Sequence, residues 1–156
     1  MIRDAKGWGN PKKYDIVIDI YFNVILTIMP PKTKVKEQGQ VFTPKHLVND
    51  ILDAAGYTNG NILNKHVIDN SCGDGAFLTE IVRRYISEFK RKNFSLDGAK
   101  PDLEKYIHGI EKDPNIFISC IKNLNKISDE LNIGQIKWDI INGDSLEIDQ
   151  YDKKMD

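Results

Sequence analysis

Three acidic residues each follow a short apolar segment of the chain. Asp69 ends the segment 65–69, Glu111 follows the segment 106–110, and Asp144 comes shortly after the segment 135–141. If these segments are strands of one parallel sheet, their carboxyl ends meet along one edge, where open α/β sheets bind ligands. We therefore expect the three carboxylates to stand together at the mouth of one crevice.

The three carboxylates can serve different parts of one ligand. A carboxylate after the second strand can accept hydrogen bonds from a ribose diol. Asp144 can accept from the exocyclic amine of a purine, and Asp69 can bind a cationic amino group directly or through water. S-adenosylmethionine carries all three groups. The plainer alternatives are that Asp69 only holds the amides of its own loop and that Asp144 is only a turn residue after Gly143.

A glycine-containing turn lies between the first strand and the next helix. The residues that follow Asp69 are Asn-Ser-Cys-Gly-Asp-Gly, and apolar residues then recur at helical spacing from Phe77 onward. Gly73 and Gly75 can adopt positive φ and leave backbone open to a ligand, and the new helix offers free N–H groups. An ordinary βα turn is the alternative. An NAD fingerprint is excluded because its third glycine is replaced by Leu78, and the chain contains no ATPase phosphate loop.

The elements that would position this turn alternate along the chain. Apolar periodicity predicts strands over about 65–69, 106–110 and 135–141 and helices over about 45–55 and 76–90, with a further helix from Pro114. Thr43 and Asp113 are expected to cap helices, because each precedes a proline. The polar segment 91–104 is expected to be a loop. This order predicts an α/β fold with about three parallel strands and flanking helices.

Composition excludes several classes of protein. The 156 residues carry 22 basic and 23 acidic side chains, so charge alone argues neither for nor against nucleic acid. Two cysteines, Cys72 and Cys120, lie far apart in the sequence, which fits free thiols in a reducing cytoplasm. The histidines fall at no metal-ligand or triad spacing, and we read them as structural. These histidines are His46, His66 and His108. We therefore predict no metal site.

The apolar segment 14–29 precedes all of these elements. It is too short to span a bilayer, so we predict no membrane association. Polar residues every four positions favour a helix packed on its own domain, although its β-branched residues also allow a strand. We expect residues 1–35 to be an N-terminal extension and residues 36–156 to be the domain. Met29 could be the native start, and intact-mass measurement on native protein would show this.

Four stretches resemble motifs of the adenine-N6 DNA methyltransferases of restriction–modification systems. The turn 69–78, Asp-Asn-Ser-Cys-Gly-Asp-Gly-Ala-Phe-Leu, resembles motif I, and 39–44, Gly-Gln-Val-Phe-Thr-Pro, resembles motif X. Segments 109–114 and 142–146 are similar to motifs II and III. The modification subunits of type I systems and the fused restriction–methylation enzymes of type II are the nearest groups. The resemblance implies the N-terminal part of a Rossmann-like class I methyltransferase sheet.

The resemblance also implies roles for matching residues. The methionine end of S-adenosylmethionine would lie against motifs X and I, Glu111 would hold the ribose and Asp144 the adenine amine. Asn70 stands where proline is usual, Asp74 replaces Ser or Thr, and Lys112 stands where a hydrophobic residue often stacks on adenine. The implied cofactor-binding residues are Phe42, Thr43, Pro44, Asp69, Cys72, Gly73, Gly75, Glu111 and Asp144.

The family's catalytic tetrapeptide, [Asn/Asp/Ser]-Pro-Pro-[Tyr/Phe], is absent from the chain, whose only Pro-Pro is Pro30-Pro31. We therefore expect no catalytic residue in these 156 residues and no methylation by this chain alone. Double-stranded DNA would be bound through other parts. A C-terminal half, a specificity subunit or a restriction subunit are further expected partners. A non-catalytic cofactor-binding or interaction module, perhaps from a truncated gene, and another nucleotide-binding α/β domain are the alternatives.

One structural consequence follows from the resemblance. In the family's sheet the first strand is central, so the edge of strand 65–69 would be open if the fourth strand is missing. An open apolar edge invites pairing with another segment. We expect residues 14–29, a second copy of the chain or a separately encoded C-terminal half to cover it.

Overall fold

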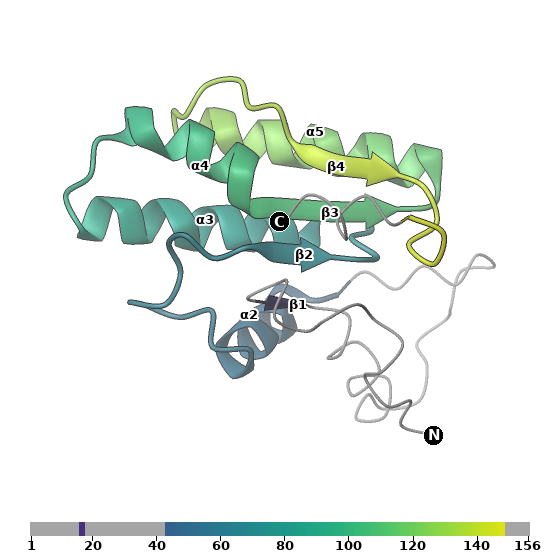
Figure 1. Ribbon diagram of the computed structural model, residues 1–156, viewed down its shortest axis with the longest axis horizontal. Helices are drawn as coiled ribbons and strands as arrows, with labels where there is room; N and C mark the ends of the chain where they lie inside the picture. The colour runs from purple at the N-terminus through teal and green to yellow at the C-terminus, as the bar shows by residue number, and fades with distance from the viewer. Residues whose placement is uncertain (1–15, 18–42, 149–156) are drawn as a thin grey trace.

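The computed structural model describes residues 16–17 and 43–148 (Figure 1). Within these residues the chain forms a four-stranded parallel sheet in the order β1-β2-β3-β4. This confirms the α/β class and places the carboxyl ends of the strands at one edge. The strands are β1 (Ile16–Val17), β2 (Val67–Asp69), β3 (Ile107–Glu111) and β4 (Asp139–Asn142).

The register of the sheet fixes which strand ends are neighbours. Asp69, the last residue of β2, pairs with Gly109, whereas Glu111, the last residue of β3, pairs with Asn142 of β4. The end of β3 therefore lies two residues beyond that of β2. The turn that follows Asp69 runs alongside this longer strand.

The helices are α2 (Lys45–Ala54), α3 (Ala76–Arg91), α4 (Ala99–Tyr106) and α5 (Pro114–Glu130), with a short 3₁₀ turn, η2 (Leu96–Gly98). The prediction of a loop over 91–104 is wrong from Leu96 onward. Ala99 and Leu103 are completely buried and draw this segment onto the core as α4. Pro101 does not prevent this, because it lies in the first turn, where no intrahelical N–H bond is lost.

The two helix starts that were predicted from Xaa-Pro pairs differ. Asp113 caps α5 as predicted: its Oδ1 accepts from Asn115 N at 2.8 Å and from Ile116 N at 3.2 Å. The cap predicted for Thr43 is wrong. Pro44, with ψ 144°, is itself the N-cap of α2, and no side-chain capping bond forms. Pro44 is held outside the helix by its extended backbone, and the helix begins at Lys45, within the predicted range of about 45–55.

The main core lies on one face of the sheet. α3 and α5 pack side by side behind β3 and β4, and α2 packs against α3 (Figure 1). On the opposite face Ile68 and Ile110 are buried, and Ile141 and Ile148 pack against them. Both faces of the strands are thus apolar, which is typical of parallel sheets in α/β proteins.

A two-residue strand covers the outer edge of β2. Ile16 pairs with Val67 and Val17 with Ile68, both in parallel. The expectation that the segment 14–29 covers this edge is confirmed for Ile16–Val17. The helix favoured for the segment is wrong at these two residues, because backbone pairing with an open strand outweighs the helical spacing there. The other residues of the segment lie outside the described part of the chain.

Two of the three histidines meet on the second face of the sheet. His66 Nδ1 lies 3.0 Å from His108 Nε2, and His108 Nδ1 lies 2.8 Å from Asp139 Oδ2. Since an ionised carboxylate only accepts, His108 Nδ1 donates to Asp139; in a neutral ring, Nε2 then accepts from His66. This chain of contacts lies toward the amino ends of the strands, away from the acidic edge. No local spacing predicts this contact, because 42 residues separate the two rings.

A buried carboxylate makes the stability depend on pH. Glu88 is 1% exposed, and it accepts from Arg91 and from Gly60 N. The hydrogen bonds from the Arg91 guanidinium hold the pKa of Glu88 below its usual value of 4.5. A lowered native pKa contributes stability that is present above the unfolded pKa and is lost as pH falls.

We therefore expect thermal stability to fall as pH drops below about 4.5, and we expect Glu88→Gln to weaken this dependence. The variant should be less stable than the wild type at pH 7 and close to it at pH 3. Glu130→Gln is the matched control, because Glu130 pairs with Arg83 on the surface. Thermal unfolding by circular dichroism checks this. Parallel pH curves for wild type and Glu88→Gln would contradict it.

Candidate functional site

The glycine turn is fastened to the neighbouring strand. Cys72 N donates to Ile110 O at 2.9 Å, and Gly75 N donates to Cys72 O at 2.9 Å. The first bond holds the turn between β2 and α3 against the end of β3, and the second closes the turn itself. The segment therefore leads directly from a strand end to a helix N-terminus, as its residue pattern predicts.

Glu111 connects the turn to the start of α5. Its Oε2 accepts from Gly73 N at 2.9 Å and its Oε1 accepts from Asp113 N at 2.8 Å. Each oxygen of a carboxylate has a further lone pair that a ligand hydroxyl can use. The predicted ribose acceptor is therefore held in a fixed orientation next to the predicted glycine turn.

Asp69 lies deep at this edge. It is 5% exposed, and its Oδ1 accepts from Ser71 N at 3.2 Å. This is the loop-holding contact that its plainer interpretation requires. Contact with a ligand amino group is not tested by this geometry and stays a prediction.

Asp144 lies beyond β4, and both of its oxygens have partners. Oδ1 accepts from Leu146 N at 3.0 Å, and Oδ2 lies 2.7 Å from Lys112 Nζ. The hydrogen bond from the Lys112 ammonium lowers the pKa of Asp144, so the carboxyl is ionised at neutral pH. The turn interpretation of Asp144 is therefore correct for one oxygen, while the other oxygen is engaged by a side chain.

The two cysteines, distant in sequence, are neighbours in the fold. Cys72 Sγ lies 3.8 Å from Cys120 Sγ, well beyond the roughly 2.05 Å of a disulfide, and both thiols are free and buried. The hydrogen bond to Cys120 and burial raise the pKa of Cys72. A protonated buried thiol is neither a nucleophile nor a metal ligand. The Cys72 side chain therefore packs in the core under the turn. If Cys72 contacts a cofactor as predicted, its backbone atoms would make that contact.

The motif X residues lie at the start of α2. Thr43 is half-buried and Pro44 is exposed. Among the described residues, no recorded hydrogen bond joins either of them to the glycine turn or to the acidic side chains. Phe42 lies outside the described residues. Their predicted place beside the cofactor therefore stays a prediction.

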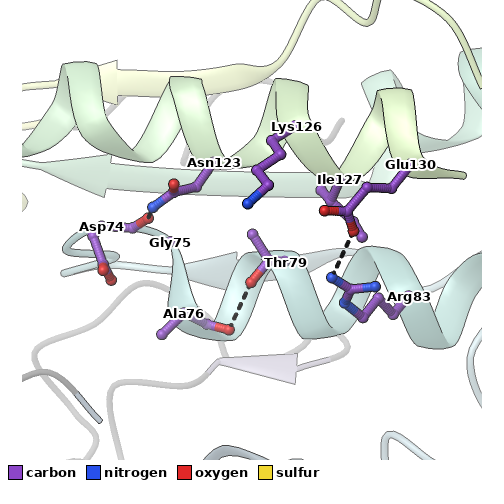
Figure 2. A pocket seen from close by; sticks show the side chains of 9 residues that line it. All are labelled: Asp74, Gly75, Ala76, Thr79, Arg83, Asn123, Lys126, Ile127 and Glu130. Atoms are coloured by element: carbon purple, nitrogen blue, oxygen red, sulfur yellow. Dashed lines mark hydrogen bonds and ion pairs between the residues drawn. The ribbon is translucent and has the colours of Figure 1, made fainter. Parts of the chain in front are cut away.

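A groove lies behind the turn, between α3 and α5 (Figure 2). It encloses about 230 Å³. It shares only Gly75 with the predicted cofactor residues, so it is distinct from the acidic edge. Asn123 Nδ2 donates to Asp74 O at 2.9 Å and ties α5 to the turn. The lining residues are Asp74, Gly75, Ala76, Thr79, Arg83, Asn123, Lys126, Ile127 and Glu130.

Two kinds of feature are absent from the part of the chain that the structure describes. No helix there is long and apolar enough to cross a membrane. The same residues contain no group of three or more His, Cys, Asp or Glu side chains arranged to hold a metal ion.

The structure also reveals residues of the edge that sequence reasoning did not assign. Asn142 Nδ2 donates to the carbonyl oxygens of Glu111 at 2.8 Å and Lys112 at 3.2 Å. In the sequence, Lys112 stands out only as a departure from motif II. Its partner Asp144 is 32 residues away, and no local pattern predicts such a pair.

The parallel sheet with its packed helices defines the class: an open α/β domain, in which ligands bind at the carboxyl ends of the strands. The family model described as N-6 DNA Methylase matches residues 12–156, and the chain belongs to this family of DNA methyltransferases. The predicted family is thereby confirmed.

Among curated proteins, the chain is similar to the Type II methyltransferase M.BstVI of Geobacillus stearothermophilus, with 36% identity over 103 residues. The match covers 64% of this chain and 18% of that protein. No solved structure gave a significant match.

Proposed function

We propose that this chain is the S-adenosylmethionine-binding part of a cytoplasmic adenine-N6 DNA methyltransferase of a restriction–modification system. The observation that carries the proposal is the contact between Glu111 Oε2 and Gly73 N at 2.9 Å, at the carboxyl edge of the sheet. This hydrogen bond links the carboxylate proposed to bind the ribose with the turn proposed to bind the methionine end, so both lie on the same side of the proposed cofactor site. Family membership and the similarity to a Type II methyltransferase support the reaction class.

Each of the three acidic residues would contact a different part of S-adenosylmethionine. Glu111 would accept from the ribose hydroxyls, and Asp144 from the adenine amine. Asp69 would act on the cationic methionine end. When bound, S-adenosylmethionine supplies an activated methyl group. The remaining proposed contacts come from Phe42, Thr43, Pro44, Cys72, Gly73 and Gly75.

A ligand panel tests the proposal. Isothermal titration calorimetry on the purified chain would compare S-adenosylmethionine, S-adenosylhomocysteine, NAD and ATP. We expect the two adenosyl sulfur ligands to bind and the other two to give no saturable heat. Preferential binding of NAD or ATP would overturn the proposal in favour of another nucleotide-binding domain.

The target base lies in DNA. We propose that parts of the methyltransferase outside these 156 residues bind it. Adenine methylation in DNA requires that the base be flipped out and held by a catalytic motif. Since residues 1–156 lack that tetrapeptide, we expect the isolated chain to transfer no labelled methyl group to DNA. Incorporation of label into adenine by the purified chain would contradict this expectation. A module that binds S-adenosylmethionine but stays inactive with every added partner would favour the non-catalytic alternative.

A further inference from the structure

Lys112 lies where the proposed adenine site must form. It directly follows Glu111, the last residue of β3, and its ammonium lies 2.7 Å from Asp144 Oδ2. The other oxygen of Asp144 is directed to Leu146 N at 3.0 Å. Oδ1 is turned toward its own loop, so Oδ2 is the oxygen on which the adenine amine would bond. The Lys112 ammonium already lies beside Oδ2, so the two donors would compete for its charge and for the space next to it.

The backbone under Lys112 is fixed, so the ion pair is a built feature of the edge. Asn142 Nδ2 donates to the carbonyls of both Glu111 and Lys112, and Gly143 N donates to Glu111 O at 2.9 Å. These bonds clamp the end of β3 to the end of β4. They hold the start of the Lys112 side chain in position opposite Asp144.

The two partners differ in their freedom to move. The Lys112 side chain is 76% exposed, whereas that of Asp144 is 24% exposed and is held by its own turn. Asp144 raises the pKa of Lys112, and Glu147 adds to this, so the ammonium is charged at neutral pH. Lys112 can move into solvent while the acceptor stays in place.

We propose that Lys112 is an affinity-limiting residue that competes with the adenine amine for Asp144 Oδ2 and must move away when the cofactor binds. This inference rests on the proposed function. The competition is between a charged donor of the protein and a neutral donor of the ligand, and hydrogen bonds from charged donors are the stronger ones. Part of the adenine contact is therefore offset by the loss of the ion pair.

The direct test is Lys112→Met, which removes the ammonium and keeps an unbranched chain. We expect S-adenosylhomocysteine to bind about two- to fivefold more tightly at low salt, the range set by exposed ion pairs. The ratio of wild-type to variant Kd should approach one as salt rises, because salt screens the pair. Lys122→Met, at an exposed position of α5, is the matched control and should match the wild type.

A second ligand separates competition from a structural effect. In S-inosylhomocysteine a carbonyl oxygen replaces the adenine amine, so this ligand lacks the position-6 N–H donor that would compete with Lys112. We expect Lys112→Met to leave its affinity unimproved. Equal tightening for both ligands, unchanged affinity for S-adenosylhomocysteine or weaker binding of it would overturn the inference while the proposed function stands. Absence of S-adenosylhomocysteine binding in all three proteins would overturn the proposed function, and this inference with it.

Discussion

Replacement of Glu111 by glutamine is expected to weaken S-adenosylmethionine binding by about 10- to 100-fold, the equivalent of losing one hydrogen bond to a charged group. The two carboxylate oxygens of Glu111 accept from two different backbone amides, Gly73 N and Asp113 N. A glutamine has one acceptor oxygen, so its amide nitrogen would face a backbone N–H. The turn and the start of α5 could not both keep their present positions. The proposed ribose acceptor would also lose its charge.

Calorimetry measures the affinity, and circular dichroism confirms that the variant is folded. Glu130→Gln is the control, because Glu130 is an exposed carboxylate on α5 that pairs with Arg83. It should bind the cofactor as the wild type does. Wild-type affinity in a folded Glu111→Gln variant would contradict the assignment of Glu111.

Gly75→Ala is expected to lower the free energy of unfolding by about 2–5 kcal/mol and to weaken cofactor binding. About 1–2 kcal/mol of this arises because Gly75 has φ +86°, a left-handed conformation that a Cβ disfavours. The new Cβ would also lie 2.9 Å from Cys120 Sγ, and such overpacking adds about 1–3 kcal/mol. The thiol has little room to move, because it is fully buried against Cys72.

Gly60 offers a matched control for the two causes. It has φ +87°, nearly the same as Gly75, but a Cβ there meets nothing within 4 Å. Gly60→Ala should therefore show only the backbone cost, and the difference between the variants is the clash with Cys120. Adding Cys120→Ala to Gly75→Ala should recover part of that difference. Equal unfolding midpoints for Gly60→Ala and Gly75→Ala in urea would contradict the packing account.

Local patterns predicted the centre of the site because its parts are close in sequence. The strand, glycine turn and helix from Val67 to Arg91 form one continuous stretch, and the Asp113 cap depends on residues two and three positions later. The alternation of strands and helices then fixed the parallel order. Glu111 and the turn could be placed at one edge from that order alone.

The remaining features depend on contacts between distant segments. The polar composition of 91–104 concealed α4, which forms because Leu103 finds a place in the core. The pairing of Ile16–Val17 with β2 replaces the helix favoured by spacing. The bond between Lys112 and Asp144 depends on two strand ends meeting, which sequence patterns do not resolve to single atoms.

The central claim is that the acidic edge holds the cofactor, and a crystal structure of the chain with S-adenosylhomocysteine tests it most directly. We predict ligand density at the carboxyl ends of β2, β3 and β4, with the ribose hydroxyls on Glu111 and the adenine amine on Asp144. Lys112 should be displaced from Asp144. Density in the groove between α3 and α5, with Glu111 and Asp144 untouched by the ligand, would contradict the account.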